Sequence, residues 1–161
     1  MKDAYINELQ RSKEYFDRST RCLEEQHSGS TPVEGTMTVA QQVAHVAQTV
    51  DWFLDGVTSD KGFSMDFEAR AKEVLSVTSL SAARQWLEKS YAAAIEYIEK
   101  TPMEELTKPV TAGALMVGMP RFGIAPSIVE HTAHHRGALT VYSRTLGLTR
   151  AMPVMEDMPA Q

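Results

Sequence analysis

Four long stretches of the chain carry apolar residues at every third or fourth position, the spacing that collects them on one face of an α-helix. The stretches run from Asp3 to about Gln26, from Thr38 to Leu54 or Gly56, from about Ser79 to Thr101, and from about Ala125 to Leu146. No segment shows the alternation of a half-buried strand. The pattern predicts an all-α protein, folded as a four-helix bundle.

Two long connections separate these helices, at residues 58–79 and 102–123. Connections of this length cross a bundle or cover the mouth of a pocket, since tight turns need far fewer residues. The first connection predicts at most one short helix, from Phe67 to Leu75. The second predicts a loop or short extended piece lying against the bundle. We expect residues 1–150 to form a single domain and residues 151–161 a C-terminal tail.

Length and composition are those of one folded domain: 161 residues, 43% hydrophobic and 23% charged. The net charge of −5 and the lack of a basic run argue against a nucleic-acid partner. No apolar stretch reaches the ~18 residues of a membrane span, and no secretory signal pattern opens the chain. With Cys22 as the single cysteine, no intrachain disulfide can form, and Cys22 itself is either a nucleophile or a small core residue. We therefore expect no membrane association and a cytoplasmic location.

Three of the five histidines lie within residues 127–139, inside the last predicted helix. At about 100° per residue, His135 falls on the apolar stripe of that helix, and His131 lies beside it one turn earlier. Both side chains are predicted to point toward the core. His134 projects away from this stripe, which predicts a rim or surface position.

Two imidazoles at positions i and i+4 can share a metal ion, because neighbouring helical turns bring such side chains together. Without the glutamate of the metalloprotease motif, however, HxxxH is a weak signal. His131 and His135 could instead be core residues hydrogen-bonded to Tyr, Ser or backbone, since an unpaired buried polar group costs about 1–3 kcal/mol. The spacing leaves both interpretations open.

The second helix is predicted to begin at Thr38, which is followed three residues later by Gln41 in a capping-box pattern. His45 lies about a third of a turn from the main apolar stripe of this helix, on a flank that it shares with Gln42, Thr49 and Trp52. Periodicity places His45 either on the surface or opposite a neighbouring helix across a polar pocket. It does not decide between the two.

The segment from Thr38 to His45, together with the block from His131 to Gly137, resembles the DinB/YfiT-like family over about residues 1–150. The resemblance implies a four-helix bundle, often homodimeric, that binds a divalent metal ion such as zinc or nickel through three histidines. Carried over by position, the ligands would be His45, His131 and His135. His134 has no ligand role in the match.

Three imidazoles without a fourth protein ligand would leave one coordination position open, as in catalytic zinc sites. Related families include mycothiol-dependent isomerases and bacillithiol S-transferases. By that analogy, the leading hypothesis is a metal-dependent transferase that activates a low-molecular-weight thiol toward a small-molecule substrate. A metal-dependent hydrolase using metal-bound hydroxide is the second hypothesis. A non-catalytic metal-binding stress-response protein is the third.

No general acid or base can be assigned from the sequence. Glu130 lies one residue before the histidine pair and so points about 100° away from it. Asp51 and Glu34 cannot be placed relative to the pair. Trp52 and Tyr142 are candidates for a pocket wall, with ordinary packing as the alternative for each.

Overall fold

The computed structural model describes residues 1–154, and these contain no β-strand. The four long helices are α1 (Lys2–Thr20), α2 (Val39–Thr58), α4 (Leu80–Lys100) and α6 (Ile124–Thr145). The shorter elements are η1 (Glu25–His27), α3 (Phe67–Leu75), α5 (Met103–Thr107) and η2 (Arg121–Gly123). The prediction of an all-α bundle with four long helices is confirmed.

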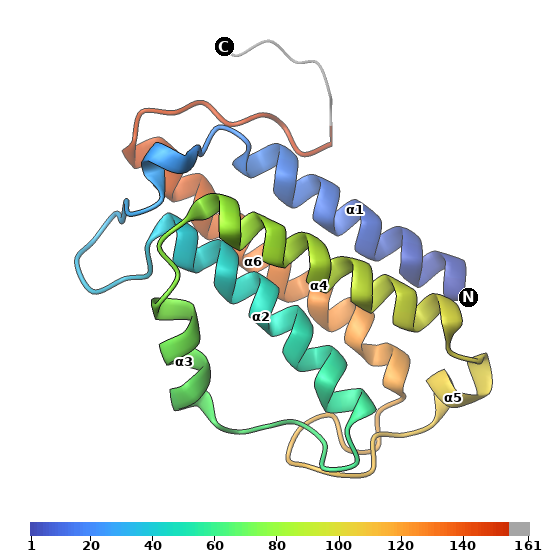
Figure 1. The fold of residues 1–161 in the computed structure, drawn as a ribbon. Coiled ribbons are helices and arrows are strands. Elements are labelled where there is room, and N and C mark those ends of the chain that lie inside the picture. Colours follow the sequence, from blue (N-terminus) through green and yellow to red (C-terminus); the bar gives the residue numbers. More distant parts are fainter. Residues whose placement is uncertain (155–161) are drawn as a thin grey trace.

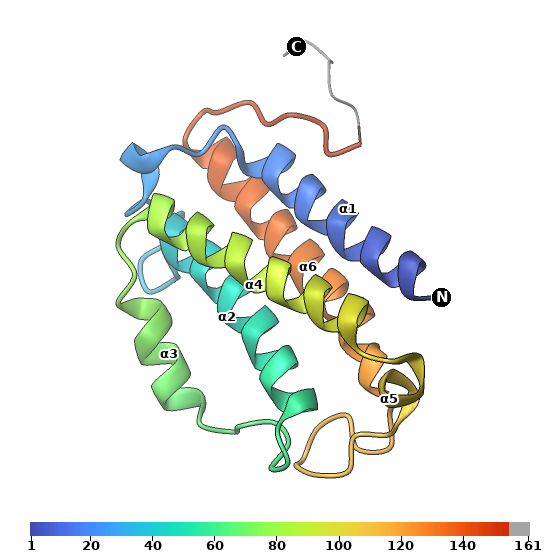
Figure 2. The same ribbon diagram turned by 45° about the vertical axis from the view of Figure 1, so that its right-hand side comes forward.

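The four long helices lie side by side as a bundle (Figure 1). Helix α1 packs against α4 and α6, and α2 packs against the same two, so α1 and α2 are diagonally opposed. Helices α1 and α6 run in one direction, and α2 and α4 run in the other (Figures 1 and 2). Because α2 and α4 are parallel neighbours, the chain must return along the bundle to join them. Helix α3 lies on this return and contacts α2.

The core is built from the apolar stripes that the sequence pattern predicts. Its largest fully buried side chains come from all four long helices and from α5: Leu9, Phe16, Val39, Val43, Leu80, Leu87, Tyr91, Ile98, Leu106, Ile124, Ile128 and Leu139. Burying one side chain of this kind contributes about 1.5–3 kcal/mol. The bundle is therefore held chiefly by its apolar interior.

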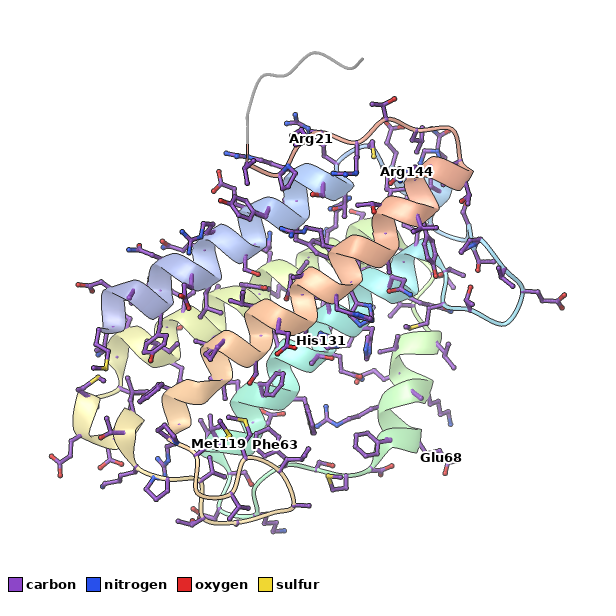
Figure 3. The ribbon with its side chains drawn as sticks, turned by 180° about the vertical axis from the view of Figure 1, so that it is seen from behind. Arg21, Phe63, Glu68, Met119, His131 and Arg144 are labelled. Atoms are coloured by element: carbon purple, nitrogen blue, oxygen red, sulfur yellow. The ribbon has the colours of Figure 1, made fainter. Side chains whose placement is uncertain are left out.

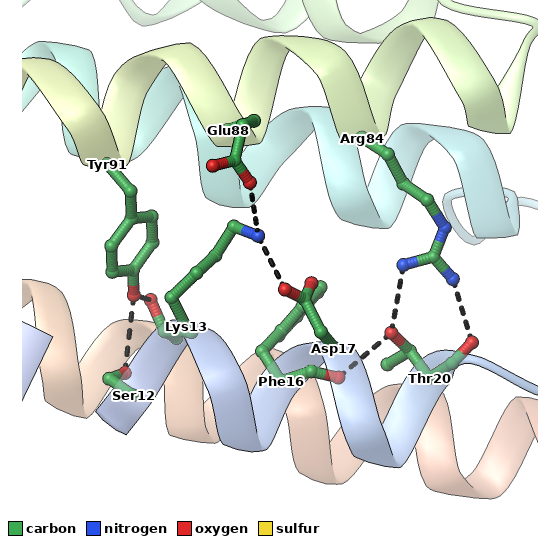
Figure 4. Close-up of polar contacts among 9 residues, drawn as sticks. Ser12, Lys13, Phe16, Asp17, Thr20, Arg84, Glu88 and Tyr91 are labelled. Atoms are coloured by element: carbon green, nitrogen blue, oxygen red, sulfur yellow. Dashed lines mark hydrogen bonds and ion pairs between the residues drawn. The ribbon is translucent and has the colours of Figure 1, made fainter. Parts of the chain in front are cut away.

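A buried polar contact joins three of the long helices (Figure 4). The Tyr91 hydroxyl on α4 lies 3.2 Å from Ser12 Oγ on α1 and 2.7 Å from Thr132 Oγ1 on α6. Burial raises the pKa of Tyr91, so the phenol stays protonated and able to donate. Ser12 interrupts the apolar stripe of α1 because it supplies this hydrogen bond between helices.

Helix α1 ends at Thr20, six residues before the predicted end at Gln26. At this early end, the Thr20 carbonyl accepts from Arg84 Nη2 on α4 at 2.8 Å (Figure 4) and from the Leu23 backbone N–H at 3.0 Å. A side-chain donor at a terminal carbonyl replaces the next helical hydrogen bond. The chain then forms η1, where the Glu24 backbone N–H donates to His27 Nδ1 at 2.9 Å.

The start of α2 follows the predicted capping box. Thr38 Oγ1 accepts from the Gln41 backbone N–H at 3.3 Å, and Gln41 Oε1 accepts from the Thr38 backbone N–H at 2.9 Å. These bonds satisfy backbone donors that the helix leaves unpaired, which fixes where α2 begins. The cap therefore sets the register of every side chain on α2, including the candidate ligand.

The two long connections differ in how well they were predicted. Helix α3 spans the predicted residues, Phe67–Leu75. In the second connection, α5 and η2 were not predicted, and two isolated bridges, Pro109 with Pro120 and Val110 with Val117, fold the loop on itself. Of the predicted tail, residues 155–161 lie outside the described part of the chain. No helix between residues 1 and 154 is both long and apolar enough to cross a bilayer.

Candidate metal centre

Three imidazoles meet where α2 packs against α6. The ring centroid of His45 lies 5.0 Å from that of His131 and 4.7 Å from that of His135, and the latter two lie 4.5 Å apart. One potential ligand nitrogen from each ring lies within 4.8 Å of the others. Within residues 1–154, no other group of three His, Cys, Asp or Glu side chains is arranged to hold a metal ion.

Helix packing explains this convergence. The apolar stripe of α2 is buried in the core, so the flank that carries His45 faces α6 instead of solvent. This settles the position of His45, which periodicity had left open. His134 is exposed, as predicted, and its ring centroid lies 4.9 Å from that of His135, with the two rings nearly perpendicular. It does not belong to the group of side chains that could hold a metal ion. Figure 3 shows the bundle from this side, with His131 labelled on α6.

A chain of hydrogen bonds behind the cluster fixes the tautomer of His135. Gln42 Oε1 can only accept, so the contact of 2.7 Å to His135 Nδ1 requires a proton on that nitrogen. Gln42 Nε2 then donates to the Tyr142 hydroxyl at 3.2 Å, which donates to the Met37 carbonyl at 2.7 Å. The lone pair of His135 is therefore on Nε2. A hydrogen-bonded partner of this kind is typical behind metal-ligating histidines.

The surroundings keep the three imidazoles neutral. Burial, reinforced by the neighbouring histidines, lowers the pKa of His131 to about 4 and that of His135 to about 3. Burial also lowers the pKa of His45, and His134 adds to this shift. At neutral pH each ring keeps an unprotonated nitrogen, the form that binds a metal ion.

The cluster opens into a largely apolar pocket of about 420 Å³. Its walls come from α2, α3 and α6 and from the loop before α2: Met37, His45, Gln48, Thr49, Trp52, Phe53, Phe67, Arg70, Ala71, Val74, Leu75 and His131. Helix α3 forms one wall, so the first long connection covers the pocket. Trp52 lines the pocket, whereas Tyr142 lies buried in the hydrogen-bonded chain behind His135.

Comparison with known proteins identifies the family. The sequence matches the DinB family over residues 2–158. The chain belongs to the DinB family. A crystal structure of a DinB-like protein from Bacillus cereus ATCC 10987 is similar, with 18% identity and a TM-score of 0.72, and the match covers 96% of this chain and 97% of that one.

A second solved structure, a DinB-like protein (YjoA) from Bacillus subtilis, has 18% identity and a TM-score of 0.63, with coverage of 92% of this chain and 95% of that one. At this identity, both similarities show the fold alone. A search of curated proteins found no match.

The donor set of this DinB-family protein fits a divalent metal ion. Three neutral imidazoles suit zinc and nickel, and no carboxylate from residues 1–154 joins them in the cluster. His45 and His131 also line the pocket, so a small molecule seated there would lie beside the site.

The other candidate residues lie elsewhere. Asp51 Oδ2 accepts from Trp86 Nε1 at 2.6 Å, and Glu130 lines a different cleft between α1 and α6. Glu34 is exposed in the loop before α2. Cys22 is half-buried, with its Sγ 3.6 Å from Ser143 Oγ. None of these four residues lines the pocket beside the histidines.

Three residues of the site were not identified from the sequence as functional. Gln42 was placed on the correct flank of α2, but its bond to His135 depends on the packing of α6. Thr49 lies one turn beyond His45, and its Oγ1 is 3.5 Å from His131 Nε2. Arg70 reaches the pocket from α3. The spacing of Gln42 and Thr49 around His45, at i−3 and i+4, is the one signal that could have indicated two of them.

Proposed function

We propose that this DinB-family protein is a metal-dependent transferase acting on a low-molecular-weight thiol. His45, His131 and His135 would hold the divalent ion, zinc or nickel. The observation that carries the proposal is that three neutral imidazoles converge at the edge of a small apolar pocket. Three protein ligands leave a coordination position for an exogenous ligand, as in catalytic sites.

When bound, such an ion holds a thiol as its thiolate at neutral pH. In the transfer, the thiol sulfur forms a bond to an electrophilic carbon, the leaving group departs with its electron pair, and the thiol proton passes to solvent. The apolar walls limit the access of water to the reacting groups. Gln42 keeps the Nε2 lone pair of His135 available by holding the proton on Nδ1.

The composition of the pocket wall favours a thiol over water as the nucleophile. Hydrolysis benefits from a general base near the attacking water. Among the described residues that line the pocket, none is Asp, Glu or Cys. A metal ion lowers the pKa of a bound thiol and of bound water alike, but a thiol starts near about 8.5 and water near about 15.7. The thiol is therefore fully ionised at neutral pH without a base, whereas bound water reaches a pKa of only about 7.

The test is a transfer assay with protein produced without an affinity tag, stripped of metal and reloaded with zinc or nickel. The electrophile is 1-chloro-2,4-dinitrobenzene, offered with cysteine, glutathione, coenzyme A, bacillithiol or mycothiol. We expect thioether formation above the metal-stripped control with at least one thiol. We expect its loss in His131→Ala and its retention in His134→Ala, the exposed neighbour. No rate above the control with any thiol would contradict the proposal.

The same protein samples test the two alternatives. A hydrolase would turn over a nitrophenyl ester without any thiol. A non-catalytic protein, in which the ion mainly joins α2 to α6, would gain thermal stability on metal loading but would show neither activity.

A further inference from the structure

The pocket beside the histidines has an uneven charge distribution. Arg70 is the one permanently charged side chain among the described residues that line it. The chain as a whole carries a net charge of −5, so a pocket wall with an arginine and no carboxylate runs against its overall composition. Clefts lined by one sign of charge favour ligands of the opposite sign.

The Arg70 guanidinium lies over the face of Trp52, with Cζ 5.8 Å from the ring centroid. Its Nε is buried and has no hydrogen-bond partner among residues 1–154. No carboxylate in the described part of the chain lies within 4.0 Å of its nitrogens, even though Arg70 also borders a second cleft lined by Asp51, Asp55, Asp66 and Glu73. A buried donor without a partner costs about 1–3 kcal/mol, which an anionic ligand would recover.

Hydrogen bonds from α2 hold the part of α3 that carries Arg70. Gln48 Nε2 on α2 donates to the Arg70 carbonyl at 2.9 Å and to Glu73 Oε2 at 2.5 Å. These two bonds fix α3 against α2, and they occupy the neighbouring carboxylate. Arg70 therefore reaches the pocket from a helix that is fixed in place, and its guanidinium lies against the Trp52 ring.

We infer that the pocket takes an organic acid with an apolar body. One carboxylate binds to Arg70, and the body packs against Trp52, Phe53 and Phe67. A volume of about 420 Å³ is in the range of small-molecule sites. This inference rests on the proposed function only for the reactive end of the ligand, which would face His45 and His131. The carboxylate could belong to the thiol or to the electrophile.

The test uses 4-phenylbutanoate and its neutral amide, 4-phenylbutanamide, titrated by calorimetry into the metal-free protein at pH 7.5. Without metal, and with the histidines neutral, Arg70 is the group that distinguishes acid from amide. We expect the acid to bind about tenfold more tightly, which corresponds to about 1.4 kcal/mol. Arg70→Gln should abolish the preference. Lys72→Gln removes an equal charge from the exposed side of the same helix and should preserve it.

Arg70→Lys keeps the charge but loses the planar donor fork, so it should retain part of the preference. Circular dichroism of each variant checks that the bundle is folded. Equal affinity for acid and amide in the wild type, no detectable binding of either, or a preference that survives in Arg70→Gln would overturn the inference. This test is independent of the proposed function. If the protein bound no zinc, the proposed function would fail, but the metal-free protein would still prefer the acid to the amide.

Adding 4-mercaptobutanoate and 4-(methylthio)butanoate to the zinc-loaded protein identifies which reactant carries the acid. If the thiol does, the free mercaptan should bind at least tenfold more tightly than its S-methyl ether, and Arg70→Gln should weaken it. If the electrophile does, Arg70→Gln should instead raise the KM for a carboxylated electrophile, 4-chloro-3-nitrobenzoate. If Arg70→Gln changed neither the affinity for the mercaptan nor the KM for the carboxylated electrophile, the inference would be overturned.

Discussion

At the scale of single residues, a glutamine orients one histidine of the candidate site. Gln42 accepts from His135 Nδ1, and the Tyr142 hydroxyl in turn accepts from Gln42. Because both ends of the amide are engaged, its orientation is determined, and so is the tautomer of His135. Gln42 therefore acts as a positioning residue for the candidate ligand.

Gln42→Met keeps most of the side-chain volume but removes the acceptor from His135. We expect zinc affinity to fall about 10–100-fold, the usual cost of losing such a partner. Competition with a chromophoric chelator measures the change. Gln85→Met makes the same replacement at an exposed position on α4 and should bind zinc as the wild type does. Unchanged affinity in Gln42→Met would show that the hydrogen bond does not support the site.

The lowered pKa values of the histidines predict how stability of the metal-free protein depends on pH. His131 and His135 titrate at about 4 and about 3 in the folded chain, and near 6.5 when unfolded. Between these values the unfolded chain binds more protons. The contribution of both residues to the free energy of unfolding is therefore constant above about pH 6.5 and decreases as pH falls toward 3.

Urea unfolding of the metal-free protein between pH 7.5 and 4.5 tests this dependence. The double variant His131→Leu/His135→Leu should lose less stability over this range than the wild type. His134→Ala should lose nearly as much stability as the wild type, because burial and not His134 is the largest cause of both lowered pKa values. An identical loss in the double variant and the wild type would mean that these two imidazoles are not held neutral by burial.

At the scale of elements, the pocket depends on how α3 and the two long connections are held. Helix α3 forms one wall, and Phe63, which precedes it, is buried against Trp52 with ring centroids 5.0 Å apart. Next to Phe63, Gly62 has a φ of 70°, which side-chain-bearing residues rarely adopt. The two connections are in contact at Gly62. A Cβ added there would lie only 2.2 Å from the Ala112 carbonyl oxygen.

Gly62→Ala should therefore lower the free energy of unfolding by about 1–3 kcal/mol, through backbone strain and the clash with Ala112. Thermal or urea denaturation provides the measurement. Gly29→Ala is the matched control, since a Cβ there meets nothing within 4 Å and its φ is not positive. Its effect should stay within about 0.5 kcal/mol. Equal effects of the two substitutions would contradict this account of the contact.

Periodicity was sufficient to predict elements with a strong apolar stripe. It located all four long helices, and the weaker pattern between Thr58 and Ser79 correctly allowed only one short helix, Phe67–Leu75. It placed the end of α1 too late, because one of the two hydrogen bonds at the Thr20 carbonyl comes from Arg84, in a distant part of the chain. It did not decide whether His45 is exposed or faces another helix, for a similar reason. What a helix flank contacts depends on which neighbouring helix packs there. The family resemblance supplied what periodicity lacked.

At the scale of the whole molecule, the order of helices brings the ligands together. Helices α2 and α6 are far apart in sequence but are antiparallel neighbours in the bundle, and the parallel pair α2 and α4 forces the chain to return past the pocket (Figures 1 and 2). The antiparallel pair thus provides the histidine cluster, and the return between the parallel pair provides the α3 wall beside it. The expected homodimer remains a prediction, which light scattering would test.

The central claim is that His45, His131 and His135 bind one metal ion. Equilibrium dialysis of tag-free protein against zinc, with metal quantified by mass spectrometry, tests it most directly. We predict one zinc ion per chain in the wild type and in His134→Ala, and loss of binding in the triple variant His45→Ala/His131→Ala/His135→Ala. Stoichiometric zinc retained by the triple variant, or none bound by the wild type, would contradict the claim.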